Sequence, residues 1–164
     1  MDIRKIYEYA LQREHEGKRF FEQSAERLQH AGVVGAFRRL ALEEQEHIRF
    51  IEGLLDALDE GEMPEPEAVD VSLDEDGFFS KRAASEMLDQ TMMESMVPDL
   101  SVLRMAYLIE RDFVEFYELA AEQAEGDARE ALEMLARWER GHERFFKRLH
   151  DSAFETYAGM PWGG

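Results

Sequence analysis

Glutamate and histidine recur at one spacing in two distant parts of the chain. Glu44 precedes His47 by three residues within LALEEQEHIRF, and Glu139 precedes His142 by three residues within LARWERGHERF. Residues three apart on an α-helix lie on one face, one turn from each other, so each pair can direct a carboxylate and an imidazole at one point. These groups are ligands of first-row divalent metal ions, so the repeated pair indicates a metal site.

Two further glutamates interrupt apolar patterns at matching places. Glu14 lies 30 residues before Glu44, and Glu110 lies 29 residues before Glu139. If each pair lies on two antiparallel helices joined by a short turn, its members face each other at one height, because the midpoint of the pair falls at the turn. Burying a carboxylate is costly unless it is paired or bound to a metal, so these positions also point to metal binding.

The elements that must position these residues are four helices. Four segments carry apolar residues at alternating steps of three and four, which predicts long amphipathic α-helices. They run over about 3–29, 33–58, 100–125 and 128–152. The connections HAG and EGD are short, so the sequence predicts two antiparallel hairpins, 3–58 and 100–152, that repeat each other.

A long link over 59–99 separates the two hairpins. Its first part is acidic and contains two prolines, which predicts a loop, and its second part, SKRAASEMLDQTMMESM, predicts a short helix. A connection of this length would cross the bundle so that the third helix starts on the required side. The whole chain, 1–164, is predicted to be one all-α domain with a tail over 153–164. Four methionines in the second part of the link are interpreted as core or cover residues that fill gaps: Met87, Met92, Met93 and Met96.

Composition excludes several classes of function. The chain has 164 residues, a net charge of −18 and no cysteine. A chain with this much negative charge repels nucleic acid and anionic membrane surfaces, and it attracts cations. The lack of cysteine excludes disulfides, zinc ribbons, thiolate iron sites and thiol catalysis. No apolar run reaches the length of a membrane span and the N-terminus lacks an apolar signal core, so the sequence predicts a cytoplasmic protein.

Together, the glutamates and histidines resemble the ligand pattern of the ferritin-like di-iron carboxylate proteins. The stretches REHEGKRFF, IERDFVEFY, EEQEH and WERGH around them are similar to the rubrerythrin branch of that superfamily, in a short form without a rubredoxin domain. The resemblance covers both hairpins and implies an all-α, ferritin-like four-helix bundle with the long crossover between helices two and three. It also implies that six residues bind two iron ions, with manganese or zinc as alternative metals: Glu14, Glu44, His47, Glu110, Glu139 and His142.

The same resemblance divides these ligands between two metals. Glu14 and His47 would bind one ion, Glu110 and His142 the other, and Glu44 and Glu139 would bridge them. The sequence departs from full rubrerythrins in two respects. It lacks the four cysteines of their rubredoxin-type iron site, so the electron donor is expected to be a separate molecule. It also has Phe113 where they have an additional carboxylate, and Gly17 is its counterpart on the first helix.

Two neighbouring residues are candidates to support the ligands. Tyr117 lies two turns after Glu110 and could bond a ligand or donate an electron, or it could be a core tyrosine with a satisfied hydroxyl. Glu43 directly precedes the first Glu-x-x-His pair and could accept the second N–H of a metal-bound histidine. Its alternative interpretation is a solvated surface carboxylate.

Three functions remain open at this point. The leading one is an oxidoreductase in which two Fe(II) ions reduce O2 or H2O2 and an external electron donor restores Fe(II). The second is a ferroxidase centre for iron storage or delivery, which would need a closed shell of subunits or a partner compartment. The third is a non-enzymatic helical interaction module with a structural metal site. The charge argues against nucleic-acid and membrane partners, and the resemblance implies a homodimer.

Overall fold

The computed structural model of the protein describes residues 2–60 and 97–161. These residues form four long α-helices and one short 3₁₀-helix, and none of them forms a strand. The elements are α1 (Ile3–Ala25), α2 (Ala31–Glu60), the 3₁₀-helix η2 (Val97–Asp99), α5 (Leu100–Gln123) and α6 (Gly126–Gly159). The predicted all-α four-helix bundle is therefore confirmed.

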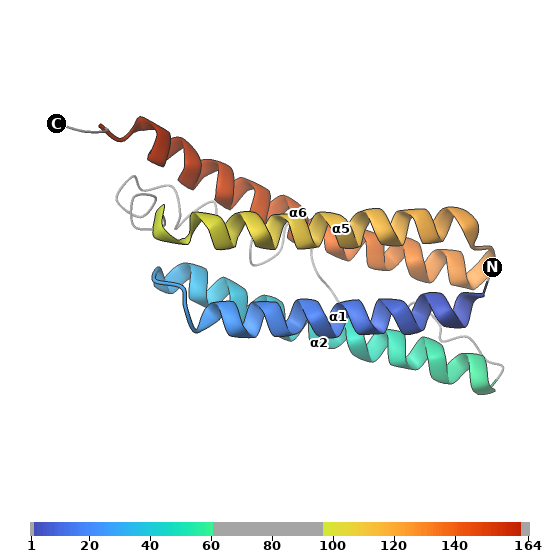
Figure 1. Cartoon of the computed structure of the whole chain (residues 1–164). Helices are drawn as coiled ribbons and strands as arrows, with labels where there is room; N and C mark the ends of the chain where they lie inside the picture. The colour runs from blue at the N-terminus through green and yellow to red at the C-terminus, as the bar shows by residue number, and fades with distance from the viewer. Residues whose placement is uncertain (1, 61–96, 162–164) are drawn as a thin grey trace.

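The helices pair as two antiparallel hairpins. α1 packs along α2, α5 packs along α6, and α1 also contacts α5. Figure 1 shows the α1–α2 turn and the α5–α6 turn at opposite ends of the bundle, and α2 ends at the end opposite to the start of α5. A connection between the hairpins must therefore span the length of the bundle. Two residues of the predicted loop, Asp59 and Glu60, instead extend α2. The rest of that loop and the predicted short helix, with the methionines singled out there, lie outside the described residues.

The turn between α1 and α2 comes earlier in the chain than the sequence predicts. α1 ends at Ala25, and α2 already includes the last two residues of the predicted turn HAG. Asp99 explains the difference, because its buried carboxylate accepts the backbone N–H of Gln29 at 3.1 Å and that of His30 at 3.0 Å. His30 then caps α2, because its Nδ1 accepts the backbone N–H of Val33 at 3.3 Å.

The last helix, α6, is longer than predicted at both ends. It begins at Gly126, whose φ of +58° is a left-handed conformation that glycine adopts without strain. At its other end α6 continues to Gly159, so the first part of the predicted tail over 153–164 is helical. Ala153 accounts for the continuation, because it is fully buried in the same hydrophobic cluster as Leu149.

Two hydrophobic clusters fill the interior of the bundle. In the first, the rings of Phe21, Phe37 and Phe146 pack together with centroid distances of 5.6, 5.7 and 5.2 Å. The second includes the buried Tyr7 and Tyr117. Along each of the four long helices, a buried glutamate lies between the residues of one cluster and those of the other. A polar layer is thus enclosed between two apolar clusters that keep water from it.

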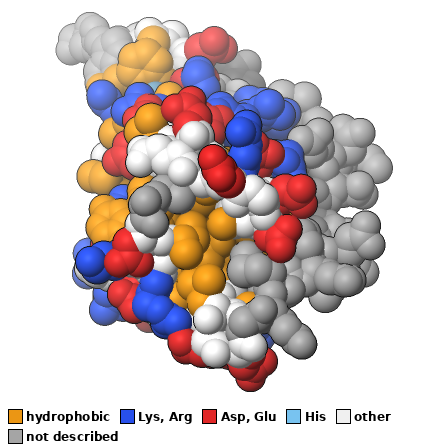
Figure 2. Space-filling model, turned by 90° about the vertical axis from the view of Figure 1, so that its right-hand side faces the viewer, with side chains coloured by type: hydrophobic (Ala, Val, Ile, Leu, Met, Phe, Trp, Pro, Cys, Tyr) orange, Lys and Arg blue, Asp and Glu red, His pale blue; other side chains and the backbone are white. Residues whose placement is uncertain are grey.

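The outside of the bundle is charged. Viewed from the end that carries the α5–α6 turn, hydrophobic side chains gather in the middle and charged side chains lie around them (Figure 2). α2 and α6 have 30 and 34 residues, lengths that could span a bilayer. Charged residues interrupt both, and within the described part of the chain no helix is apolar enough over a sufficient length to cross a membrane.

Candidate metal centre

Six polar side chains converge in the layer between the hydrophobic clusters. α1 and α5 each supply one of them, and α2 and α6 each supply two, in every case from the face that points into the bundle. Five are fully buried and the sixth is 4% exposed. The structure therefore brings together all the side chains that the sequence predicted as metal ligands: Glu14, Glu44, His47, Glu110, Glu139 and His142.

Three carboxylates surround His47. Its Nδ1 lies 2.8 Å from Glu139 Oε1, 3.4 Å from Glu14 Oε2 and 3.5 Å from Glu44 Oε2. One potential ligand atom from each of the four residues lies within 4.8 Å of the others, a spacing that suits donors around one cation. We call this group of residues the His47 position.

A second group surrounds His142, and we call it the His142 position. The Nδ1 of His142 lies 3.2 Å from Glu139 Oε2, 3.5 Å from Glu44 Oε1 and 3.5 Å from Glu110 Oε2. Glu44 and Glu139 thus belong to both groups, and each directs one oxygen to His47 and the other to His142. The two imidazole rings lie 5.4 Å apart between centroids. This is the arrangement in which two shared carboxylates can bridge two cations.

The centre holds more hydrogen-bond acceptors than donors. Within the described residues, six carboxylate oxygens of its four glutamates are buried without a hydrogen-bond partner. His47 Nδ1 also lacks one, because Glu139 Oε1 is 2.8 Å away but not aligned for a hydrogen bond. Buried carboxylates without partners are costly, and cations relieve that cost. Two divalent ions would balance the charge of four carboxylates, so the residues present fit a pair of metal ions.

In the metal-free protein, protons provide the compensating positive charge. Burial, reinforced by the carboxylate of Glu44, raises the pKa of Glu14 to about 7. Burial also raises the pKa of Glu110 well above its usual value. For His47 and His142 burial alone would lower the pKa, but the surrounding carboxylates outweigh it and raise the pKa of both well above 6.5. Metal ions must displace these protons, so binding should strengthen as pH rises.

Both residues that the sequence proposed as supports of the ligands contact them. Tyr117 is fully buried, and its hydroxyl donates a hydrogen bond to Glu14 Oε1. Glu43 is 4% exposed, and its Oε2 accepts the Nε2–H of His142 at 2.9 Å. Arg39 Nε donates to the other oxygen of Glu43, also at 2.9 Å. Glu43 is therefore a buried partner of the centre and not a solvated surface carboxylate.

Sequence reasoning missed Trp138 as a neighbour of the centre. Its ring stacks on the imidazole of His47, with 5.1 Å between centroids and 13° between planes, and it meets Phe50 edge-on at 5.3 Å. The signal that could have found it is its place in the internal repeat. Trp138 directly precedes the second Glu-x-x-His pair, as Glu43 directly precedes the first.

Comparison with protein families settles the relationship. The chain matches the family model described as Rubrerythrin over residues 5–150, a range that contains the whole candidate metal centre. The chain belongs to the rubrerythrin family. Comparison with curated proteins found no significant match, and neither did comparison with solved structures. The family match and the two overlapping groups of buried ligands fit a dimetal site within a ferritin-like bundle.

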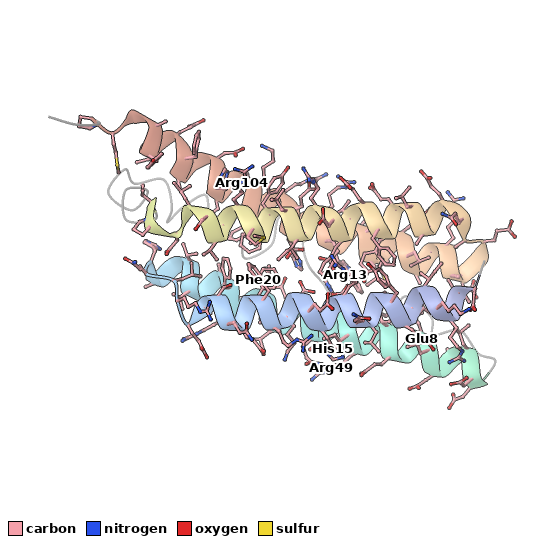
Figure 3. All side chains as sticks on the ribbon, in the orientation of Figure 1. Glu8, Arg13, His15, Phe20, Arg49 and Arg104 are labelled. Carbon is pink, nitrogen blue, oxygen red and sulfur yellow. The ribbon has the colours of Figure 1, made fainter. Side chains whose placement is uncertain are left out.

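Phe113 stands where the resemblance to full rubrerythrins implied an additional carboxylate. A Cβ on Gly17 would lie 3.0 Å from Phe113 Cε2 and 4.0 Å from Glu44 Oε2, so the glycine makes room for the ring. The guanidinium of Arg13 lies 5.3 Å from the centroid of that ring, on the side of α1 that faces α5 (Figure 3). Phe113, held by this cation–π contact, belongs to the second hydrophobic cluster.

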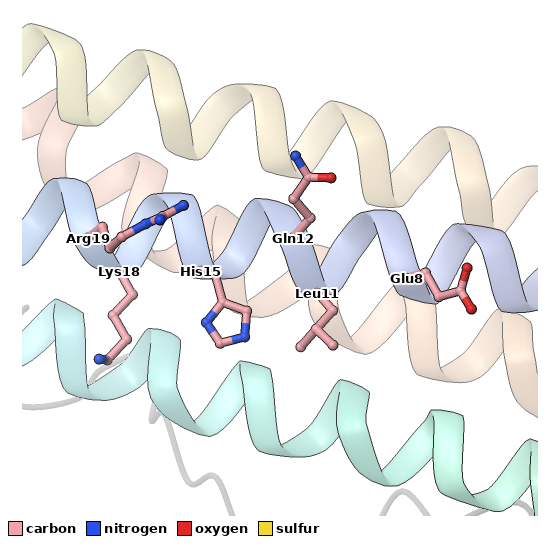
Figure 4. Close-up of a pocket in the computed structure, with 6 residues that line it drawn as sticks. All are labelled: Glu8, Leu11, Gln12, His15, Lys18 and Arg19. Carbon is pink, nitrogen blue, oxygen red and sulfur yellow. The ribbon is translucent and has the colours of Figure 1, made fainter.

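The groove in Figure 4 is separate from the metal centre. It lies on α1 and is lined by Glu8, Leu11, Gln12, His15, Lys18 and Arg19. His15 follows Glu14 directly in the chain, but His15 is exposed whereas Glu14 is fully buried, so the two side chains point to different sides of the helix. Among the described residues, His15 belongs to neither group that could hold a metal ion.

Proposed function

We propose that this protein is a di-iron oxidoreductase that reduces O2 or H2O2 with electrons from an external donor. The observation that carries the proposal is the sharing of Glu44 and Glu139 between the two positions. A centre with two shared carboxylates and one histidine at each position suits a pair of iron ions, since iron binds both oxygen and imidazole ligands. Two bound iron ions would supply the redox chemistry.

The side chains of the protein support that chemistry in three ways. The four glutamates bind and neutralise the ions, and the hydrophobic clusters on both sides exclude water from the layer. Tyr117 keeps a proton at Glu14 Oε1, because burial and the nearby carboxylates raise the pKa of this tyrosine well above 10. It therefore remains a hydrogen-bond donor to Glu14 throughout the neutral pH range.

Metal loading under controlled oxidation tests the proposal. Metal-free protein is loaded with Fe(II) without oxygen, the iron bound per chain is counted, and O2 or H2O2 is then added while near-ultraviolet absorption is followed. We expect two irons per chain and a rapid rise of a ferric absorption band. The double variant Glu44→Ala, Glu139→Ala should lose both, because it removes both shared ligands. Glu46→Gln is the matched control, since Glu46 lies on the same helix but its side chain is 45% exposed and pairs with Arg49.

The same experiment separates the proposal from its two rivals. Continued uptake and oxidation of iron beyond two per chain, in a large closed assembly, would support iron storage. Two bound metals that neither oxidant changes would support a structural metal site. Less than one iron per chain, or equal binding by the double variant, would contradict the dimetal proposal altogether.

A further inference from the structure

The two histidines of the centre have different neighbours on their outer sides. The Nε2–H of His142 donates to Glu43 at 2.9 Å. The Nε2 of His47 is buried and has no hydrogen-bond partner within the described residues, and the ring of Trp138 stacks against that imidazole. Glu43 and Trp138 hold equivalent places in the internal repeat, because each directly precedes a Glu-x-x-His pair. The two halves of the centre therefore differ at one equivalent residue.

We propose that the two metal positions have unequal affinity. The His142 position binds its metal ion more tightly than the His47 position, and Glu43 is the positioning residue that makes the difference. This inference rests on the proposed dimetal centre and adds to it an order of loading, in which the His142 position fills first and the His47 position exchanges more readily.

The carboxylate of Glu43 is fixed at both of its oxygens. Oε1 accepts from Arg39 Nε at 2.9 Å, and Oε2 accepts from His142 Nε2 at 2.9 Å. Once a metal ion displaces the second proton of His142, the hydrogen that stays on Nε2 leaves the Nδ1 lone pair for the metal, and Nδ1 is the atom that faces the three carboxylates of its position. A carboxylate behind a histidine orients the ring, selects this tautomer and raises its basicity. Removal of such a partner typically costs about 10- to 100-fold in metal affinity.

His47 has no comparable partner. To bind a metal through Nδ1, its ring must carry the hydrogen on Nε2, and that N–H would be buried without an acceptor among the described residues. An unpaired buried N–H is unfavourable, so part of the binding free energy at this position is lost. Stacking on Trp138 holds the plane of the ring, but it neither selects the tautomer nor raises its basicity.

The terminal carboxylates favour the same order. Glu14 Oε1 already accepts a hydrogen bond from Tyr117, so only Oε2 of Glu14 remains for a metal ion. Glu110 has no hydrogen bond at either oxygen within the described residues, so both can bind at the His142 position. The His142 position thus offers one more free oxygen than the His47 position.

Titration of the metal-free protein with Co(II) tests the inference without any turnover. Cobalt binding is followed by its visible absorption, with a chelator in competition to measure the tighter step. We expect two cobalt ions per chain in two resolved steps whose dissociation constants differ by about 10-fold or more. Glu110→Ala should remove the tighter step and Glu14→Ala the weaker one, which assigns each step to a position.

Variants at Glu43 identify the cause of the difference. Glu43→Ala should weaken the tighter step by about 10- to 100-fold and leave the weaker step nearly unchanged. Glu43→Gln should fall between Glu43→Ala and the parent protein, because its amide oxygen still accepts the Nε2–H. Glu46→Gln again serves as the control. Circular dichroism confirms that each variant is folded, and the conservative variant keeps the test decisive if Glu43→Ala is unfolded.

The reciprocal change is made at Trp138. Trp138→Glu places a carboxylate at the position that Glu43 holds in the other half of the repeat. The dissociation constant of the weaker step should therefore fall toward that of the tighter step. The inference is overturned if two cobalt ions bind with equal affinity, if Glu43→Gln and Glu43→Ala leave the tighter step unchanged, or if Trp138→Glu brings no gain. Failure to bind two metals at all would overturn the proposed function as well. If two cobalt ions bind in unequal steps but bound iron is oxidised by neither O2 nor H2O2, only the proposed oxidoreductase activity is contradicted.

Discussion

Tyr117 and Tyr7 show that the contribution of a buried hydroxyl to stability depends on its hydrogen-bond partner. Both side chains are fully buried, but the hydroxyl of Tyr117 bonds Glu14, whereas that of Tyr7 has no partner within the described residues. We expect Tyr117→Phe to lower the free energy of unfolding by about 1–2 kcal/mol, because it leaves Glu14 Oε1 without its donor. Tyr7→Phe is the matched control and should be neutral or slightly stabilising. Urea denaturation of the metal-free variants measures both, and equal losses would contradict this assignment.

Some features of the candidate metal centre could be predicted from the sequence, and others could not. The convergence of Glu44 and His47 could be predicted because their spacing on one helix is a local property, and helix geometry then fixes their direction. The pair Arg39–Glu43 is also local to α2, four residues apart. The stacking of Trp138 on His47 could not be predicted in this way, because it depends on how α2 and α6 face each other across the bundle. The internal repeat carries part of this information, since it makes Trp138 the equivalent of Glu43.

At the scale of the helices, Asp99 joins the two hairpins. It precedes α5, yet its carboxylate accepts two backbone N–H groups from Gln29 and His30 in the α1–α2 turn. Asp99→Ala should lower the free energy of unfolding by about 1–3 kcal/mol, because both donors would be left without this acceptor. Chemical denaturation measures the loss, with Asp112→Ala as the control at an exposed position of α5. A loss no larger than that of the control would show that water replaces the carboxylate.

Gly17 tests how closely α1 must approach α5. Alanine is the better helix former by about 1 kcal/mol, so Gly17→Ala would stabilise an open helix surface. Here the new Cβ would lie 3.0 Å from the buried ring of Phe113, and the ring would have to move. We expect this overpacking to outweigh the gain and lower the free energy of unfolding by about 1 kcal/mol or more.

Gly53→Ala on α2 is the control for that substitution. A Cβ at Gly53 would meet no atom within 4 Å, so this variant should be neutral or more stable by up to about 1 kcal/mol. The double variant Gly17→Ala, Phe113→Leu should recover part of the loss, because leucine lacks the ring atoms that clash. Thermal denaturation measures all three variants. A Gly17→Ala protein as stable as Gly53→Ala would mean that Phe113 moves aside without cost.

The helices themselves follow from the apolar spacing, but their ends do not. The predicted amphipathic segments locate α1, α2, α5 and α6 correctly, because the alternating spacing of three and four between apolar residues involves only residues near in sequence. The end of α1 depends on Asp99, about 70 residues away in the chain, and the continuation of α6 depends on core packing around Ala153. Contacts of that kind arise only when the hairpins assemble.

For the molecule as a whole, the centre belongs to the interface between the hairpins. The His47 position takes three of its residues from the first hairpin and Glu139 from the second. The His142 position takes three from the second hairpin and Glu44 from the first. Neither hairpin alone completes a position, so metal binding would be coupled to assembly of the bundle, and a bound metal should stabilise the whole fold.

This coupling predicts opposite pH dependences for the metal-free and the metal-loaded protein. In the metal-free fold the pKa values of Glu14, Glu110, His47 and His142 are raised, so around neutral pH the folded state binds more protons than the unfolded chain. Its free energy of unfolding must therefore fall as pH rises through about 5 to 8. The pKa values of three other carboxyl groups are lowered, and their contribution is lost on acidification below about pH 4.5: Glu43, Glu44 and Glu139.

The metal-free protein should therefore be most stable at mildly acidic pH, whereas the metal-loaded protein should gain stability as pH rises, because metal ions and protons compete for the same atoms. Differential scanning calorimetry at about pH 5.5, 7 and 8.5, after chelation or after loading with Mn(II), measures both trends. The Glu44→Ala, Glu139→Ala double variant serves as the control and should respond little to Mn(II). A metal-free Tm that rises over this range would mean that the buried carboxyl and imidazole groups do not hold the protons assigned to them.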